Sequence, residues 1–337
     1  MRVARLTAVL VLALAVTSCS RPAGPELAAA EGDGGAVGLI ASTTTVESGP
    51  KLAQQSSQWP KLDTSGNPRA IVTNGGVVVP VRGPADGGGW RITTPCGKES
   101  TLRSGRTIGA VHVVLDPGHG GTEIGAVAGN GMREKDVNLA LAQAVADKLR
   151  AQGVSVQLTR EADYRVPIVT RAEIVNSLHP KLFISIHHNG GGAPVHTGPG
   201  TEVFFQKSSP ESKRLAGLVW QDVFASLSPF NVKWIGATDA GAIYRSDRDG
   251  SDFYGVLRRT AGVPAALAEI AYLSNAPEAD IIGRGDFRDA AAAGIASAVV
   301  RYFSTNDPGG GFNTPVFRGY DDGGGGTTAN CKDPALT

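Results

Sequence analysis

The sequence predicts an α/β fold in which helices flank a mostly parallel, twisted sheet, preceded by a small N-terminal β subdomain. Two runs, 111–115 and 182–186, consist almost wholly of apolar residues that favour strands, as expected of parallel strands covered on both faces. Segments with helical periodicity alternate with such runs along the chain. Alternating strands and helices are typical of α/β layers, and they place the main domain at 109–303.

The first residues have the features of an export signal. Arg2 and Arg5 precede an apolar stretch, 6–16, that is too short to span a bilayer as an ordinary helix. The sequence Val-Thr-Ser-Cys at 16–19 resembles a bacterial lipobox, which implies cleavage before Cys19 and lipidation of that cysteine. An ordinary secretory signal with an incidental cysteine is the alternative. We therefore expect a signal peptide at 1–18 and a protein anchored by lipid to the outer face of the cytoplasmic membrane, in the cell envelope.

Two segments separate this signal from the main domain. Residues 19–68 are rich in Gly, Ala, Ser, Thr and Pro without a sustained period, which predicts a disordered tether. Residues 69–108 contain short runs of strand-forming residues separated by a Pro-Ala-Asp-Gly-Gly-Gly turn. They predict a small β subdomain with strands at 70–72, 76–81 and 90–94.

The main domain contains alternating strand and helix candidates. The helix 136–151 is the best defined, with Asp136 as a possible cap, apolar residues every fourth position from Val137 to Leu149, and Gly153 after its end. Strands are expected at 111–116, 154–159, 182–187, 201–206, 242–245 and 265–270. The other helices are expected at 167–178, 209–227, 252–261 and 286–303.

The tail at 304–337 is Gly-rich and shows no helix or strand period. We expect it to be irregular unless Cys331 ties it back to the domain. With Cys19 set aside, Cys96 and Cys331 are the remaining cysteines. An even remainder in an exported protein predicts a disulfide between them, and two unrelated thiols are the alternative.

Charge and composition exclude one class of function. The formal net charge is +1 over 337 residues, and aromatic residues make up 6%. The chain therefore has neither the basic surface nor the stacking residues that nucleic-acid binding requires. We expect no nucleic-acid partner, and we expect a monomer.

Four residues that can bind metal or move protons lie where predicted strands end or helices begin: His119, Glu134, His187 and Glu269. Ligands of open parallel sheets gather beyond the carboxyl ends of the strands, so we expect these side chains to meet. Two His and one carboxylate form a catalytic zinc site with a position left for water, and a second carboxylate can act on that water. Each residue also has a simpler interpretation. His119 would be a loop histidine, and Glu134, in the loop before the predicted helix, would be an acid favoured there by the helix dipole. Glu269 would be a core carboxylate paired with Arg258 or Arg259.

Five motifs in order resemble a known family over about 109–303. They resemble the zinc N-acetylmuramoyl-L-alanine amidases of the type 3 cell-wall amidase family, although the family's usual Gly-Phe is Ala271-Tyr272 here. The motifs are Asp-Pro-Gly-His-Gly-Gly (116–121), Glu-Lys-Asp-Val-Asn-Leu (134–139), Leu-Thr-Arg (158–160), Ile-Ser-Ile-His (184–187) and Ala-Glu-Ile-Ala-Tyr-Leu-Ser-Asn (268–275).

The resemblance implies a role for each site residue. His119, Glu134 and His187 would hold zinc, and Glu269 would be the catalytic carboxylate. Strand parity does not decide between His187 and His188, because both faces of that strand are buried; position in the family favours His187. Arg160 and Arg171 are expected to brace the fold or a substrate loop.

The resemblance also implies a reaction. The substrate would be peptidoglycan, and the bond cleaved would join the lactyl group of N-acetylmuramic acid to L-alanine of the stem peptide. The residues alone support only zinc-dependent amide hydrolysis. A zinc carboxypeptidase or endopeptidase acting on the stem peptide is one alternative, and a non-catalytic wall-binding protein that keeps the amidase fold is another.

Overall fold

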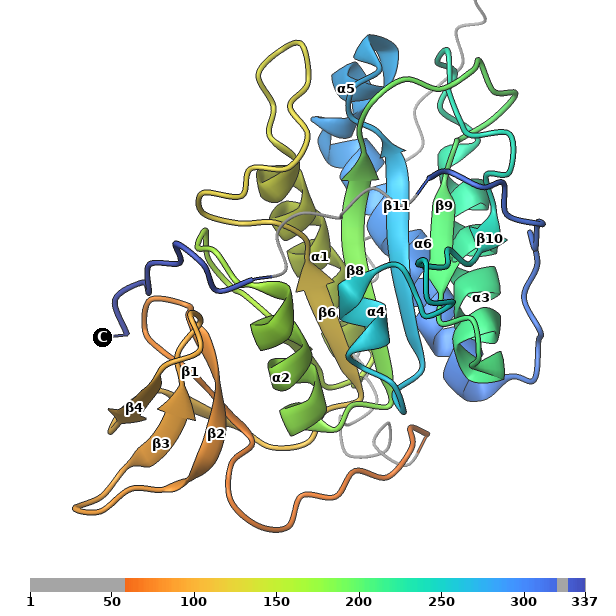
Figure 1. The fold of residues 1–337 in the computed structure, drawn as a ribbon. Helices are drawn as coiled ribbons and strands as arrows, with labels where there is room; N and C mark the ends of the chain where they lie inside the picture. Colours follow the sequence, from red (N-terminus) through yellow and green to blue (C-terminus); the bar gives the residue numbers. More distant parts are fainter. Residues whose placement is uncertain (1–57, 320–326, 337) are drawn as a thin grey trace, which may run out of the picture. The chain divides into compact units, whose positions relative to one another are not determined.

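The computed structural model describes residues 58–319 and 327–336 (Figure 1). The predicted signal peptide, Cys19 and most of the tether predicted for 19–68 lie outside these residues. Within the described part of the chain, no helix combines the length and the apolarity needed to cross a membrane.

The larger sheet contains β6 (Val113–Pro117), β7 (Val156–Leu158), β8 (Leu182–Asn189), β9 (Glu202–Phe205), β10 (Ala242–Ile243) and β11 (Ala265–Tyr272). These six strands lie in the order β10-β9-β11-β8-β6-β7. Each neighbouring pair is parallel except β11 and β9, which run antiparallel. The predicted α/β class with a mostly parallel sheet is therefore confirmed.

The helices are α1 (Glu134–Ala151), α2 (Ile168–Leu178), α3 (Pro210–Leu227), α4 (Gly255–Arg258), α5 (Ala276–Ile282) and α6 (Gly285–Ser304). They cover both faces of the sheet (Figure 1). Val113 and Leu115 pack with residues of α1, α3 and α6, whereas Val114 between them packs with residues of α2 and α4. Successive side chains of a strand point to opposite faces, so two covered faces require the uninterrupted apolar run seen in the sequence.

Helix α1 begins earlier than predicted, at Glu134 rather than at Asp136. No side chain caps this end of the helix, and Asp136 lies in its first turn. Instead the Glu134 N–H donates to the carbonyl oxygen of Ala126 at 2.9 Å, and Arg133 Nε donates to Asp136 Oδ2 at 2.6 Å. A contact with the preceding loop therefore overrides the local cap signal, and it makes Glu134 a helix residue rather than a loop residue.

The N-terminal region forms an antiparallel sheet in the order β4-β3-β2-β1-β5. Its strands are β1 (Ala70–Val72), β2 (Val78–Pro84), β3 (Trp90–Thr93), β4 (Glu99–Leu102) and β5 (Arg106–Ile108). The sequence did not predict β4 and β5, because each has a single buried side chain, Leu102 and Ile108. The Val78 N–H donates to the Tyr164 hydroxyl at 2.8 Å, which joins this sheet to the loop before α2.

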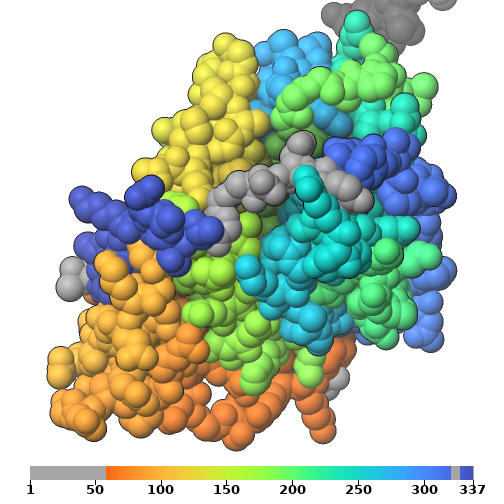
Figure 2. Space-filling view, in the orientation of Figure 1, coloured from red at the N-terminus to blue at the C-terminus, as the bar shows by residue number. Residues whose placement is uncertain are grey.

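The tail is held at two places. Residues near Phe312 run beside β10, where the Ala242 N–H donates to the carbonyl oxygen of Gly311 at 2.7 Å. Farther along, a disulfide joins Cys331 to Cys96 with an S–S distance of 2.07 Å. Figure 2 shows both described parts of the tail in blue, with 327–336 against the orange N-terminal strands.

Candidate metal centre and catalytic pocket

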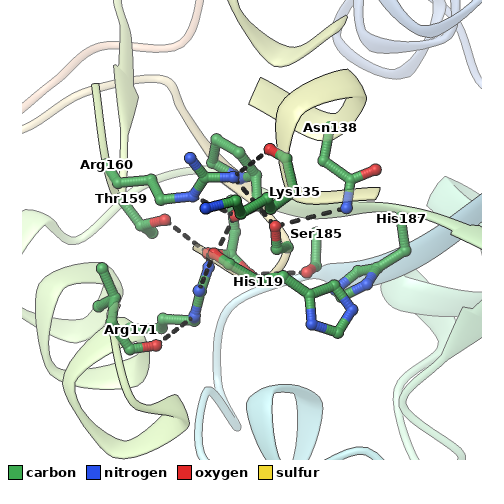
Figure 3. Close-up of polar contacts among 12 residues, drawn as sticks. His119, Lys135, Asn138, Thr159, Arg160, Arg171, Ser185 and His187 are labelled. Atoms are coloured by element: carbon green, nitrogen blue, oxygen red, sulfur yellow. Dashed lines mark hydrogen bonds and ion pairs between the residues drawn. The ribbon is translucent and has the colours of Figure 1, made fainter. Parts of the chain in front are cut away.

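Three predicted ligands meet at the carboxyl-end edge of the larger sheet. His119 follows β6, Glu134 begins α1 and His187 lies on β8, and one ligand atom from each lies within 4.8 Å of the other two. The Glu134 carboxylate lies between the two rings, with Oε2 at 3.1 Å from His119 Nε2 and Oε1 at 3.0 Å from His187 Nδ1. Figure 3 shows the His119 and His187 rings close together. This donor set of two imidazoles and one carboxylate fits a catalytic zinc.

The close approach of these groups depends on glycine. A Cβ on Gly118 would lie 2.1 Å from His187 Cε1, and a Cβ on Gly125 would lie 2.4 Å from Glu134 Oε2. His119 itself has a φ of +58°, a conformation that non-glycine residues rarely adopt and that clusters at functional sites. The Gly-rich motif around His119 therefore serves to bring backbone and ligands together.

Glu134 is held in place on all sides. Its Oε2 accepts from the Ala126 N–H at 2.8 Å, and its Oε1 accepts from Asn138 Nδ2 at 3.1 Å and from the His188 N–H at 3.2 Å. Burial alone would raise the pKa of the Glu134 carboxyl, but the hydrogen bonds and charges of His119 and His187 hold that pKa well below its usual range. The carboxylate is therefore charged and fixed, as a metal ligand requires.

His188 points away from this group. It is buried, and its Nδ1 lies 2.8 Å from Asn138 Oδ1. Burial lowers the pKa of His188 to about 4, so its ring is neutral near pH 7. His188 and Asn138 together support Glu134 from behind. Asn138 was not predicted as part of the site, although a helix starting at Glu134 places Glu134 and Asn138 on one face by their i, i+4 spacing.

A buried ion pair fixes the loop that carries His119. Arg171 Nη1 lies 2.6 Å from Asp116 Oδ1, and Arg171 Nη2 donates to the His119 carbonyl oxygen at 2.6 Å. Ser185 Oγ donates to Asp116 Oδ2 at 2.7 Å, and Thr159 Oγ1 donates to Asp116 Oδ1 at 2.5 Å. Burial alone would raise the pKa of Asp116, but the Arg171 charge and these hydrogen bonds bring it below its ordinary value.

Arg160 braces the same loop from the other side. Its side chain donates to the carbonyl oxygens of Pro117 at 3.0 Å, Gly118 at 3.1 Å and Lys135 at 2.7 Å. Figure 3 shows Arg160 and Arg171 on either side of the loop. The two arginines therefore have the bracing role expected from the sequence, and they hold the backbone from which His119 projects.

Glu269 faces the same pocket without joining the ligand group. The pocket has a volume of about 240 Å³ and is lined by residues that include His119, His187, Glu269, Tyr254 and Glu123. Glu269 is the register partner of His187 on the neighbouring strand, and its Oε2 is buried without a hydrogen-bond partner among the described residues. Burial, and then the charges of Glu134 and Glu202, raise the pKa of Glu269 well above its usual range.

The alternative in which Glu269 is a core carboxylate paired with a nearby arginine does not fit this arrangement. Arg258 lies 3.6 Å from Asp247 and donates to backbone carbonyl oxygens of the same loop. The carbonyl oxygen of Arg259 accepts from Asn176. Glu269 is therefore a half-buried acid that lines the pocket beside the proposed metal ligands.

Comparison with known proteins places this site in a family. The sequence profile of the Amidase_3 family, described as N-acetylmuramoyl-L-alanine amidase, matches residues 113–301. The chain belongs to this family. The match begins at β6 and ends within α6, so the N-terminal sheet and the tail lie outside it. The group of His119, Glu134 and His187 is typical of the zinc-binding site of Amidase_3 proteins, and zinc is the cofactor that this donor set indicates.

Individual relatives match more than half of the chain. The uncharacterized protein YqiI of Bacillus subtilis (strain 168) is 32% identical over 64% of this chain and 97% of its own length. The N-acetylmuramoyl-L-alanine amidase AmiA of Escherichia coli (strain K12) is 31% identical over 57% of this chain and 75% of its own length. Among solved structures, the catalytic domain of the amidase CwlV from Bacillus (Paenibacillus) polymyxa is 31% identical, with a TM-score of 0.48, over 57% of this chain and 97% of that one.

Proposed function

We propose that this Amidase_3 protein cleaves peptidoglycan at the amide bond between the lactyl group of N-acetylmuramic acid and L-alanine of the stem peptide. In this proposal His119, Glu134 and His187 hold zinc, and Glu269 is the general base. N-acetylmuramoyl-L-alanine amidase activity on peptidoglycan follows from membership of the family. The observation that carries the assignment of roles is that Glu269 lines the pocket with the two histidines, while its Oε2 has no hydrogen-bond partner among the described residues.

The donor set supports a catalytic metal rather than a structural one. Three protein ligands leave a fourth position open for water or substrate, whereas structural zinc sites use four protein ligands. When bound, zinc polarises the amide carbonyl and lowers the pKa of a nearby water. Glu134 is held by hydrogen bonds from Ala126, Asn138 and His188, so it keeps its place without help from the substrate.

Glu269 supplies the proton transfers. Its carboxylate accepts a proton from the water that attacks the amide carbonyl, and it then gives that proton to the amine that leaves as the N-terminus of L-alanine. A raised pKa makes the Glu269 carboxylate a stronger proton acceptor than an ordinary glutamate, which suits a general base.

The bond that is cleaved can be identified directly. Purified peptidoglycan is digested with the enzyme, and the new termini are identified by mass spectrometry, with a chelator-treated sample as control. The proposal expects free stem peptides that begin with L-alanine, and none after metal removal. Products cut within the stem peptide would instead support a zinc carboxypeptidase or endopeptidase. No cleavage by the zinc-loaded protein would support a wall-binding role.

We further propose that the mature protein is a lipoprotein on the outer face of the cytoplasmic membrane. The support is the Val-Thr-Ser-Cys sequence at 16–19, which lies outside the described residues. A cell-wall amidase acts outside the cytoplasm, and the Cys96–Cys331 disulfide suits such an oxidising compartment. Replacing Cys19 by Ala should move the protein from the membrane fraction to the soluble fraction. Unchanged membrane fractionation would contradict the lipid anchor.

A further inference from the structure

Outside the family match, the tail places one cation among buried acids. Arg318 Nη2 lies 2.5 Å from Glu202 Oε1 and donates to Asp239 Oδ1. The contact with Glu202 is an ion pair without hydrogen-bond alignment, because Glu202 Oε1 has no hydrogen-bond partner among the described residues. Both acids are buried, at 1% exposure for Glu202 and 5% for Asp239. Buried carboxylates without a compensating charge are strongly destabilising.

The tail is fastened so that Arg318 reaches this position. The Val316 N–H donates to Asp239 Oδ2 at 2.6 Å, and Asn313 Nδ2 donates to the carbonyl oxygen of Ala240 at 2.6 Å. Arg245 Nη2 donates to the carbonyl oxygen of Gly319 at 3.1 Å. The first two contacts are with the segment that leads into β10 and the third is with a residue just after β10, so the tail is fixed on both sides of the arginine.

Glu202 lies next to the proposed general base. In the ladder between β11 and β9, Glu202 is the register partner of Glu269, and in the ladder between β11 and β8, Glu269 is the register partner of His187. Residues directly opposite each other on neighbouring strands point to the same face. Two carboxylates on one face repel each other unless a cation compensates one of them, and Arg318 compensates Glu202.

Glu202 also holds the backbone just beyond Glu269. The register between β11 and β8 shifts after Glu269, so that Tyr272 is opposite Asn189. Glu202 Oε2 accepts from Asn189 Nδ2 at 2.9 Å and from the Tyr272 hydroxyl at 3.3 Å. A bulge of this kind re-aims neighbouring side chains and is frequent beside active sites. One carboxylate therefore ties together the two strand ends that carry His187 and Glu269.

We propose that Arg318 is a positioning residue for hydrolysis: it holds Glu202 in place, and Glu202 fixes the strand ends that aim Glu269 into the pocket. The inference rests on the proposed role of Glu269. It makes the tail part of the catalytic unit, although the family match ends before it. The competing explanation is that Arg318 only fastens the tail.

Two arginines of this chain allow a matched test. Arg301 also contacts two acids, Asp222 and Asp307, and its side chain is 27% exposed compared with 26% for Arg318. Its partners lie in α3 and in the tail after α6, and neither lies on a strand next to β11. Arg301→Gln therefore removes a similar ion-pair network near the tail without touching Glu202.

The experiment measures kcat, KM and zinc content with a soluble N-acetylmuramoyl peptide. Arg318→Gln is expected to lower kcat by about 10- to 100-fold, as misplacement of a catalytic group by about 1 Å does, with a smaller change in KM and one zinc per chain. Arg318→Lys should recover most of kcat, because a single nitrogen contacts both acids and an ammonium can replace it. Arg301→Gln should keep the wild-type kcat.

Other outcomes separate the explanations. Equal losses of kcat in Arg318→Gln and Arg301→Gln, or no loss in Arg318→Gln, would overturn the inference. If Arg318→Gln does not fold, the triple variant Glu202→Gln/Asp239→Asn/Arg318→Gln removes both buried acidic charges together with their shared cation. The proposal expects its kcat to lie well above that of Glu269→Gln, and an equally low value would overturn it. A wild-type kcat in Glu269→Gln would instead overturn the role of Glu269, whatever the Arg318 variants do.

Discussion

The two carboxylates nearest His187, Glu134 on α1 and Glu269 on β11, have opposite surroundings. On the side of α1, Glu134 accepts hydrogen bonds from Ala126, Asn138 and His188, and its pKa lies well below the usual range. On the side of β11, Glu269 keeps one oxygen without a partner among the described residues, and its pKa is raised. Acids whose surroundings separate their pKa values in this way have different chemical roles. The fixed, charged acid suits a ligand, and the free acid suits a proton acceptor.

The largest expected effect tests the ligand side. His187→Ala removes a donor from the group, so it should abolish both zinc binding and hydrolysis, because the metal would keep only two protein ligands. His188→Ala is the matched control on the next residue. Its ring contacts Asn138 and not the donor atoms, so it should retain zinc. Metal analysis of both purified variants shows which histidine binds zinc. Zinc loss confined to His188→Ala would mean that His188, and not His187, is the ligand.

A smaller effect is expected from the support behind Glu134. Asn138→Ala removes one hydrogen bond to Glu134 Oε1 and the partner of His188. Losing such a group behind a ligand typically weakens metal binding by about 10- to 100-fold. Zinc affinity is measured by competition with a chelator, and Gln143→Ala on the exposed side of α1 serves as the control. Equal affinities for the two variants would show that Asn138 does not support the site.

A further expected effect concerns folding stability rather than metal binding, and it involves Asp116. Because the pKa of folded Asp116 lies below its ordinary value of 3.8, its contribution to stability is present above that value and is lost as pH falls through the lower folded pKa. Asp116→Asn leaves Arg171 buried without its charge partner and should cost about 3–5 kcal/mol at pH 7. Urea unfolding of the metal-free wild type and of metal-free Asp116→Asn is measured at pH 7 and at pH 3. The difference between their free energies of unfolding should be smaller at pH 3. A constant difference would contradict the ionised pair.

The sequence predicted the parts of this pocket that depend on local pattern. Apolar runs located β6 and β8, and His119 and His187 follow from the motifs at their ends. The start of α1 was not predictable, because it depends on the Glu134 N–H reaching the carbonyl oxygen of Ala126. Arg318 was not predictable either. It lies in a Gly-rich tail without periodicity, and its partners Glu202 and Asp239 are distant in sequence.

The central claim is that Glu134 holds the metal while Glu269 moves the proton. It is tested most directly by measuring zinc content and the rate of stem-peptide release for two variants, Glu134→Gln and Glu269→Gln. We expect Glu134→Gln to lose both zinc and activity. We expect Glu269→Gln to bind one zinc per chain and to be slower than the wild type by about 10²–10⁴-fold, the usual contribution of a general base. Loss of zinc from Glu269→Gln, or near-normal release of stem peptides by it, would contradict the division of roles between the two acids.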